Sequence, residues 1–223
     1  MSSFNFNLRK MRALPLSVEH PVHPSVTSKA KRVLDIFGAV VGLVLTAIIV
    51  IPVAIAMQFD DPGNIFYSQV RCGYDGKPFT IWKFRSMIID ADKKKHLVEN
   101  QATGHIFKNE CDPRVTRVGR FLRYTSLDEF PQFWNVLRGE MSLVGTRPPT
   151  IEEVAMYEGH HFERLKVKPG ITGEWQVRGR SQVLDFEEIV VLDLAYQKKW
   201  SFFYDLNLIA RTIAVVLARK GAC

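Results

Sequence analysis

The chain has little cysteine, and its histidines show no metal-ligand pattern in the sequence. Its 223 residues include only three cysteines, Cys72, Cys111 and Cys223, with no Cys-x-x-Cys pair. Neither a disulfide framework nor a structural zinc site is therefore expected. His160 and His161 are neighbours in sequence. Because adjacent side chains on a helix or strand diverge, we expect these two rings to point apart at the surface.

Two further absences concern the N-terminal part of the chain. Residues 1–30 lack the apolar run of a secretory signal, and we interpret them as a polar N-terminal tail. Residues 36–59 lack any charged side chain and consist mostly of Val, Ile, Leu and Ala. This run exceeds the roughly 20 residues that cross a hydrocarbon core, so it predicts a membrane helix. A buried helix of a soluble protein is the alternative.

The flanks of the apolar run bear on its topology. Both flanks are basic, so the Lys/Arg asymmetry that orients a spanning helix is missing. Pro52 removes a helical hydrogen bond and predicts a kink. We therefore predict a re-entrant membrane helix over residues 31–59, and a plain spanning helix stays open. Asp35 is expected to pair with Lys31 or Arg32, or to cap a helix.

Basic residues outnumber acidic ones, 30 to 23, which gives a net charge of +7. Such a surplus favours nucleic acid, anionic lipid or phosphorylated partners. Within residues 114–123, arginines recur every third position beside Val115, Val118 and Leu122. On a helix this pattern makes a basic stripe next to an apolar one. The stripe predicts either an interfacial helix on anionic lipid or a phosphate-binding wall.

Two other regions have recognisable patterns. Short strands are predicted at residues 65–69 and 79–84, on either side of a glycine-containing turn at 73–77. Residues 192–218 combine aromatic side chains and lysines with an apolar run too short to span a membrane. This combination predicts a C-terminal interfacial helix, and a core helix is the alternative.

Two adjacent carboxylates, Asp128 and Glu129, directly follow the arginine-rich stretch. Carboxylates and arginines gathered in this way are typical of sites for a polyanionic substrate and a divalent cation. Helix capping is the local alternative, because Ser126-x-x-Glu129 has the form of a capping box. Pro131 soon afterwards is unusual for a purely structural cap. A helix N-terminus would also keep Asp128 ionised, as a nucleophile or metal ligand requires.

Two weaker motifs concern sugar nucleotides and phosphate. Asp90 and Asp92 have the Asp-x-Asp form that many sugar-nucleotide enzymes use to hold a metal, but they also fit an ordinary helix start in a lysine-rich stretch. The glycine-proline loop at 168–173 is followed by Arg178 and Arg180. These residues offer close backbone approach and forked donors for phosphate. A tight loop with exposed arginines is the alternative.

The ordered motifs resemble the bacterial sugar transferases, or monotopic phosphoglycosyl transferases. The match begins near residue 31 and reaches the C-terminus. The blocks that carry it are Lys31-Arg32-x-x-Asp35, Gln69-x-Arg71-x-Gly73-x-x-Gly76-Lys77-x-Phe79, Lys83-Phe84-Arg85-Ser86-Met87, Asp112-Pro113-Arg114, Leu122-Arg123, Ser126-Leu127-Asp128-Glu129, Met141-Ser142-Leu143-Val144-Gly145-x-Arg147-Pro148 and Pro169-Gly170-Ile171-Thr172-Gly173.

The resemblance implies a reaction and a location. A UDP-sugar donates its sugar phosphate to undecaprenyl phosphate and UMP is released, through a covalent aspartyl-phosphosugar intermediate and with Mg²⁺ as cofactor. The expected location is the bacterial inner (cytoplasmic) membrane, with a monotopic helix and the catalytic domain on the cytoplasmic face. The C-terminal tail is similar to that of hexose-1-phosphate transferases of exopolysaccharide assembly, so glucose or galactose is the expected sugar. Membrane lipid is a further partner, nucleic acid is not, and a homodimer stays open.

The resemblance also assigns residues and an architecture. Asp128 would be the nucleophile and Glu129 its partner, both near the metal. Substrate contacts are implied for Lys83, Arg123, Arg147, Arg180, Asp193 and Asp205. The expected fold is α-rich α+β: a polar tail (1–30), the re-entrant helix (31–59), and a compact catalytic domain (60–223) with a small hairpin and amphipathic interfacial helices.

Two departures and two other functions complete the expectations. Ile51 stands where the family often has a serine before the helix-breaking proline, and Thr146 stands where a proline is common. A metal-dependent glycosyltransferase that uses Asp90 and Asp92 would release UDP rather than UMP. A membrane scaffold without enzymatic activity would bind nucleic acid or anionic lipid in a salt-sensitive way.

Overall fold

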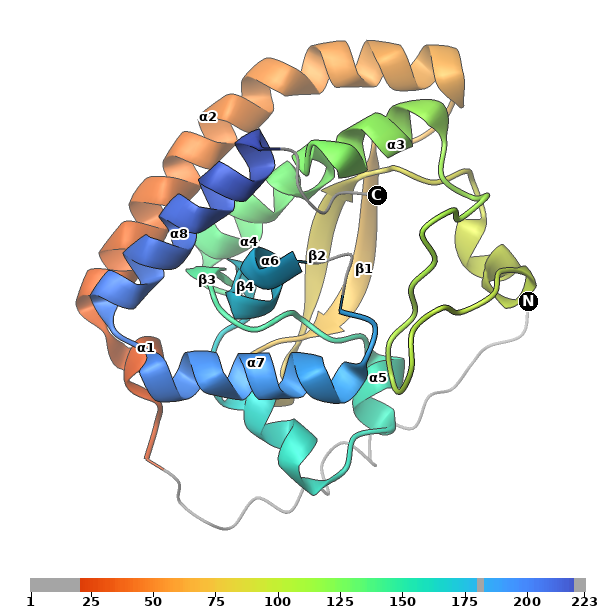
Figure 1. The fold of residues 1–223 in the computed structure, drawn as a ribbon. Coiled ribbons are helices and arrows are strands. Elements are labelled where there is room, and N and C mark those ends of the chain that lie inside the picture. The colour runs from red at the N-terminus through yellow and green to blue at the C-terminus, as the bar shows by residue number, and fades with distance from the viewer. Residues whose placement is uncertain (1–20, 180–182, 219–223) are drawn as a thin grey trace.

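The structure is a computed structural model that describes residues 21–179 and 183–218 (Figure 1). Most of the predicted polar tail lies outside these residues. Its described part is ordered, because α1 (Pro24–Thr27) forms a short helix whose first turn is capped by His23. The other ring nitrogen of His23, Nε2, lies 3.0 Å from the carbonyl oxygen of Gln197. The end of the predicted tail is therefore packed onto the body of the protein.

The apolar run forms one long helix, α2 (Lys29–Asp60), which bends along its length (Figure 1). The Ser28 hydroxyl caps it by accepting a hydrogen bond from the Lys31 backbone N–H. Pro52 lies inside the helix, where a bend is expected. In the described residues, α2 is the one helix that is long and apolar enough to cross a membrane. Only 22% of its most apolar window is buried, which disfavours the core helix of a soluble protein.

The first turns of α2 are tied to the domain through basic side chains. Lys31 and Asp205 form an ion pair at 2.6 Å, and both are almost completely buried. Arg32 donates hydrogen bonds to the carbonyl oxygens of Val136 and Leu137, at 2.7 and 2.6 Å. A cation at these carbonyls is electrostatically favourable, because the C-terminal end of a helix carries partial negative charge. These contacts fix α2 to the protein before its apolar part begins.

Asp35 has other partners than the sequence predicted. Its Oδ1 accepts hydrogen bonds from the Ser142 hydroxyl at 2.8 Å and from the Leu143 backbone N–H at 2.9 Å. These contacts take the place of a direct ion pair with Lys31 or Arg32, because the segment Ser142–Val144 brings its donors to the same turn of the helix, but the Lys31 charge still acts on Asp35. A buried carboxylate that accepts such bonds offsets part of its desolvation cost.

The predicted hairpin is confirmed. Strands β1 (Phe66–Cys72) and β2 (Pro78–Phe84) pair antiparallel, from Phe66 opposite Phe84 to Cys72 opposite Pro78. A short 3₁₀ turn, η2 (Tyr74–Gly76), joins them. A second, parallel pair consists of β3 (Ser142–Val144) and β4 (Gly170–Thr172).

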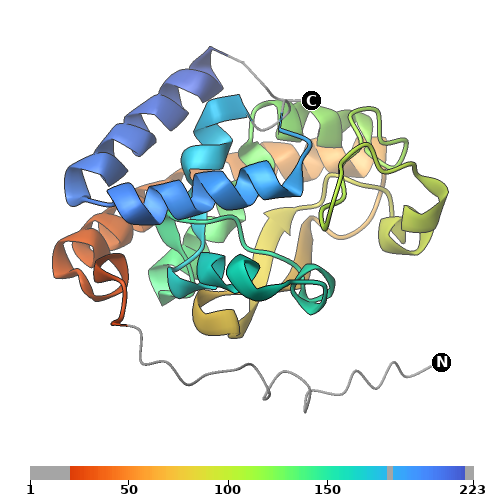
Figure 2. The ribbon, with the colours of Figure 1, turned by 60° about the horizontal axis from the view of Figure 1, so that its bottom comes forward.

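The rest of the described chain is mostly helical, as expected for an α-rich fold. In Figures 1 and 2, α7 (Phe186–Lys199) and α8 (Phe202–Leu217) follow one another at an angle and are joined by a short turn. The remaining helices are η3 (Ala91–Leu97), α3 (Arg117–Tyr124), η4 (Leu127–Gln132), α4 (Phe133–Arg138), α5 (Ile151–Ala155), η5 (Gly159–Lys166), α6 (Glu174–Gly179), α7 (Phe186–Lys199) and α8 (Phe202–Leu217).

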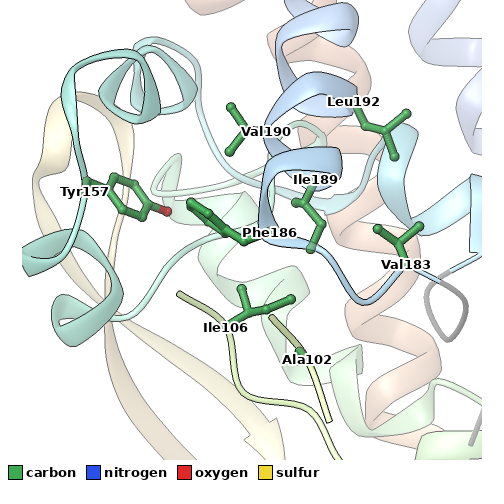
Figure 3. Packing of buried hydrophobic residues seen from close by; sticks show 8 residues of the cluster. All are labelled: Ala102, Ile106, Tyr157, Val183, Phe186, Ile189, Val190 and Leu192. Atoms are coloured by element: carbon green, nitrogen blue, oxygen red, sulfur yellow. The ribbon is translucent and has the colours of Figure 1, made fainter. Parts of the chain in front are cut away.

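Buried apolar side chains hold the long loop before α3 against α7. Figure 3 shows Ala102 and Ile106 of this loop beneath Phe186 and Ile189 of α7. Burial of these side chains stabilises the loop by removing apolar surface from water. Helix α8 instead has two faces, since Leu208 is fully buried while side chains such as Phe203, Leu206 and Ile213 are exposed. The core-helix alternative therefore holds for the buried face. The exposed apolar face is what an interfacial helix requires, and the interfacial location stays a prediction.

Gly119 allows α3 to approach the end of the hairpin closely. A Cβ at this position would lie 1.9 Å from the Ser86 carbonyl oxygen, which is a backbone atom. Gly119→Ala is expected to lower the free energy of unfolding by about 1–3 kcal/mol, because backbone must shift. Gly159→Ala is the control, since a Cβ there meets nothing within 4 Å. Equal thermal unfolding of both variants would contradict this packing role.

Candidate active site

A cavity of about 1060 Å³ lies between the hairpin, η4 and the loops around η3 and α5. Its walls combine carboxylates with lysine and arginine side chains. The charged residues on which the argument depends are Arg71, Lys83, Arg123, Asp128, Glu129 and Arg147. Five of the eight predicted site residues line this cavity: Lys83, Arg123, Asp128, Glu129 and Arg147. Arg71 was not among the predicted site residues.

Asp128 and Glu129 lie at the start of η4, directly after α3. Ser126, which precedes this 3₁₀ helix, has a positive φ of 58°, and its side chain does not cap the helix. The capping-box alternative is therefore wrong, because Ser126 is a left-handed link between two helices. Asp128 is 7% exposed, yet it lines the cavity. Its buried carboxylate is thus placed where a ligand can reach it.

The segment that carries Asp128 touches the apolar helix. Element η4 packs against α2, and the Thr46 hydroxyl lies 3.3 Å from the Phe130 carbonyl oxygen as a hydrogen-bond donor. Gly42 of α2 packs against the Phe133 ring, since a Cβ there would come within 2.3 Å of it. The two carboxylates are therefore held directly beside the helix predicted to enter the membrane.

Two cations lie next to the carboxylates. Lys83 Nζ and Glu129 Oε1 form an ion pair at 3.1 Å, with both side chains partly exposed. Arg123 Nε donates to the Ser86 hydroxyl at 2.9 Å. Burial lowers the pKa of Arg123, and the negative charge of Asp128 opposes that shift. An arginine remains protonated under these conditions, so Arg123 contributes a fixed positive charge beside Asp128.

The predicted arginine stripe is only partly helical. Arg114 precedes α3 and forms a buried ion pair with Asp112 at 2.6 Å. This contact, through hydrogen bonds to Asp112, raises the pKa of Arg114 despite its burial. The stripe therefore divides: Arg114 braces the loop and Arg123 lies beside Asp128.

Arg147 is held by a carboxylate on α5. Its two terminal nitrogens donate to the two oxygens of Glu153, at 3.0 and 3.1 Å. Glu153 also completes a capping box with Thr150 at the start of α5. Burial opposes both charges, but the ion pair prevails: the pKa of Glu153 is lowered and that of Arg147 is raised. The planar pair fixes the direction of the Arg147 guanidinium.

The structure does not bring Asp193 or Asp205 to this cavity. Asp193 pairs with Arg164 at 2.7 Å, and each side chain is 1% exposed. Asp205 pairs with Lys31 and also accepts a hydrogen bond from Trp200. Both aspartates thus belong to buried ion pairs that join distant segments. The predicted site residue Arg180 lies outside the described residues.

Asp90 and Asp92 do line the cavity, at the start of η3. The helix whose start was the alternative interpretation of this pair is a short 3₁₀ helix, preceded by Asp90 with a positive φ of 61°. Asp90 pairs with Lys93 at 2.9 Å, and Asp92 accepts from the Tyr67 hydroxyl at 3.2 Å. This second acidic pair therefore lies in the cavity, where the metal-dependent glycosyltransferase would require it.

The prediction of two diverging surface histidines is wrong. His160 and His161 lie in a 3₁₀ helix with ring centroids 4.1 Å apart, and both contact Glu187, at 3.0 and 2.6 Å. His161 is buried. Its Nδ1 accepts from the Glu158 backbone N–H, so Nε2 carries the proton of the neutral ring and donates to Glu187. Glu187 thus joins the two rings, and the three side chains lie close enough together to be candidate ligands for a metal ion.

The donor chemistry beside Asp128 fits Mg²⁺. This ion prefers carboxylate oxygen and commonly binds through one or two carboxylates completed by substrate phosphates. Asp128 and Glu129 present such carboxylates at the cavity wall, and Glu129 is ion-paired with Lys83. In the described residues, the group of three candidate ligands lies elsewhere, at His160, His161 and Glu187. Mg²⁺ at Asp128 would therefore need oxygens from the ligand.

Fold and site together define a class: a helix-rich protein whose long apolar helix packs against a cavity of carboxylates and guanidinium groups. The chain belongs to the bacterial sugar transferase family, whose sequence model matches residues 26–219. This match covers most of the chain and agrees with the motifs noted in the sequence.

Curated relatives carry names from the same chemistry. The protein named Galactosyl transferase CpsE of Streptococcus agalactiae is 50% identical over 195 residues, which cover 86% of this chain and 43% of that protein. The UDP-glucose:undecaprenyl-phosphate glucose-1-phosphate transferase of Escherichia coli is 39% identical over 237 residues, with coverages of 98% and 48%. Exopolysaccharide production protein ExoY of Rhizobium meliloti is 37% identical over 202 residues, with coverages of 86% and 88%. The chain thus spans about half the length of the first two relatives.

Proposed function

We propose that this chain transfers a hexose-1-phosphate from a UDP-sugar to undecaprenyl phosphate and releases UMP. The observation that carries the proposal is the position of Asp128. Its buried carboxylate lines a cavity with Arg123 and Arg147, on a segment that packs against the apolar helix. The names of the relatives support a lipid-phosphate acceptor and a glucose or galactose donor.

The proposed chemistry has two displacements at one phosphorus atom. An Asp128 oxygen attacks the phosphorus that bears the sugar, and the bond from that phosphorus to the UMP oxygen breaks. An oxygen of undecaprenyl phosphate then attacks the same phosphorus, and the bond to Asp128 breaks. Phosphoryl transfer depends mainly on in-line positioning and charge stabilisation. Two transfers through one carboxylate need no general acid, because UMP leaves as an anion.

The remaining charged residues have supporting roles in this proposal. Lys83 orients Glu129 through their 3.1 Å ion pair. Arg123 and Arg147 stabilise negative charge on the phosphates during each displacement. Mg²⁺, held by Asp128 and Glu129, would supply charge neutralisation between the attacking carboxylate and the diphosphate.

The proposed location is the inner membrane, with the domain on the cytoplasmic face. Support comes from the basic flanks of α2 and from the contacts of Lys31 and Arg32, which hold the start of the helix on the domain. A re-entrant path for α2 would return the chain to that same face. The cavity would then lie at the depth of lipid headgroups, where the phosphate of a polyprenyl lipid resides.

UMP release tests the proposed function. The full chain in nanodiscs is given Mg²⁺, undecaprenyl phosphate and one UDP-sugar at a time, and the nucleotide product is identified by chromatography. We expect continued UMP release from UDP-glucose or UDP-galactose when the lipid is present. When the lipid is omitted, UMP release should stop at one equivalent per protein. That single equivalent is the stoichiometry of a covalent intermediate.

Other products would redirect the assignment. UDP instead of UMP would favour the metal-dependent glycosyltransferase, for which Asp90 and Asp92 in the same cavity are the specific support. Absence of both nucleotides, together with salt-sensitive binding to anionic liposomes, would favour the membrane scaffold.

A further inference from the structure

Arg71 is a guanidinium group in the cavity that the proposed chemistry has not used. It lies on β1, where its Nε donates to Gln69 Oε1 and its Nη1 donates to the Pro148 carbonyl oxygen, both at 3.0 Å. Among the described residues, these two are the hydrogen bonds of its side chain, and neither uses Nη2. The two bonds fix the guanidinium plane against the loop that carries Arg147. The Arg71 guanidinium is thus held in a fixed orientation by Nε and Nη1, and its Nη2 can donate to a ligand.

Arg71 and Arg147 share one carboxylate neighbour. Glu153 accepts both terminal nitrogens of Arg147, and its negative charge also acts on Arg71. Burial and the nearby charge of Arg147 lower the pKa of Arg71 to about 10. Both arginines are therefore charged near neutral pH, and Glu153 is the carboxylate that acts on both. Glu129 also acts on Arg71 and Asp193 on Arg147, but these two carboxylates are ion-paired with Lys83 and Arg164. A partly buried excess of positive charge is costly unless an anion completes it.

We infer that Arg71 and Arg147 together form a seat for one phosphate group, with Glu153 as the residue that positions Arg147. Two neighbouring guanidinium groups match the oxygens of a phosphate, and both line the same cavity as Asp128. The inference rests on the proposed function for the identity of the ligand. That phosphate belongs either to the nucleotide diphosphate or to the lipid phosphate, since both present the same oxygens.

Direct binding tests the seat apart from turnover. UDP and inorganic pyrophosphate are titrated by calorimetry against the full chain in phosphatidylcholine nanodiscs. Arg71→Gln is expected to weaken binding of both ligands about 10-fold or more. Arg71→Lys is expected to lose less, because it keeps the charge but not the fork. Lys77→Gln, an equal charge change on the exposed turn of the same hairpin, is the control and should bind like wild type.

Steady-state assays then distinguish the two sources of phosphate. For a seat that holds the nucleotide, Arg71→Gln raises KM for the UDP-sugar and leaves KM for undecaprenyl phosphate unchanged. For a seat that holds the lipid phosphate, the reverse holds, and pyrophosphate binding still weakens. Glu153→Gln should raise the same KM as Arg71→Gln with little change in kcat, as expected of a positioning residue.

Two results would overturn the inference. One is unchanged affinity of Arg71→Gln for both UDP and pyrophosphate. The other is a lower melting temperature with wild-type affinity, which would assign Arg71 to holding β1 on the Pro148 loop. The seat and the proposed function fail separately: weaker pyrophosphate binding by Arg71→Gln supports the seat even where the wild-type protein releases no UMP.

Discussion

Replacing Asp128 by asparagine is expected to abolish UMP release, with a loss of about a thousandfold or more. The variant keeps the size of the side chain but removes the charge and the nucleophilic oxygen. Because the carboxylate is buried beside Arg123, its loss also leaves that cation less compensated. Turnover of UDP-glucose and UDP-galactose is the measurement. Intact-protein mass spectrometry without lipid should show a sugar-phosphate adduct on the wild-type protein only.

Asp92→Asn is the matched control for this prediction. It makes the same chemical change in the same cavity, at a carboxylate whose partner is the Tyr67 hydroxyl. Near-normal UMP release by Asp92→Asn, beside an inactive Asp128→Asn, supports the proposed nucleophile. The opposite pattern, with UDP as product, would assign the chemistry to the Asp-x-Asp segment. Full turnover by Asp128→Asn would refute the covalent mechanism.

The second large effect concerns stability. Asp205→Asn is expected to lower the free energy of unfolding by about 3–5 kcal/mol, because it leaves Lys31 charged and buried without its partner. Asp205 also accepts hydrogen bonds from Tyr196 and Trp200, so three contacts weaken together. Thermal unfolding followed by tryptophan fluorescence measures the loss. At roughly 2–4 °C per kcal/mol, the melting temperature should fall by at least roughly 6 °C.

An exposed ion pair provides the comparison. Asp75 and Lys166 lie 3.5 Å apart with about a third of each side chain exposed. Asp75→Asn makes the same substitution, and asparagine tolerates the positive φ of 55° at this position. The expected loss is under about 1 kcal/mol, since exposed pairs contribute little. Equal destabilisation by both variants would show that burial of the Lys31–Asp205 pair is not what stabilises α2 on the domain.

Local patterns were sufficient for several features. The uncharged run over residues 36–59 predicted α2, and two short strand segments on either side of a glycine-containing turn predicted the hairpin. The acidic pair Asp128 and Glu129 among basic residues predicted a site, and the structure places both in one cavity with Lys83. These features depend on neighbours close in sequence, so their physical cause is visible in the sequence itself.

Other features depend on contacts between distant segments. Asp205 meets Lys31 across 174 positions, so no local pattern could separate its buried ion pair from a substrate contact. Arg114 and Arg123 belong to one periodic stretch, yet the first braces a loop and the second lies beside Asp128.

Family motifs and local periodicity therefore determined the class of protein, its apolar helix and the acidic pair. Only the tertiary structure decided which charged residues line the cavity and which form buried ion pairs away from it. Arg71 illustrates the difference. Its sequence motif does not indicate a role for it, whereas the structure places it on β1 near Arg147 in the cavity. The physical reason is that Coulomb interactions and desolvation depend on distance in space and on burial, which are set by packing rather than by spacing along the chain.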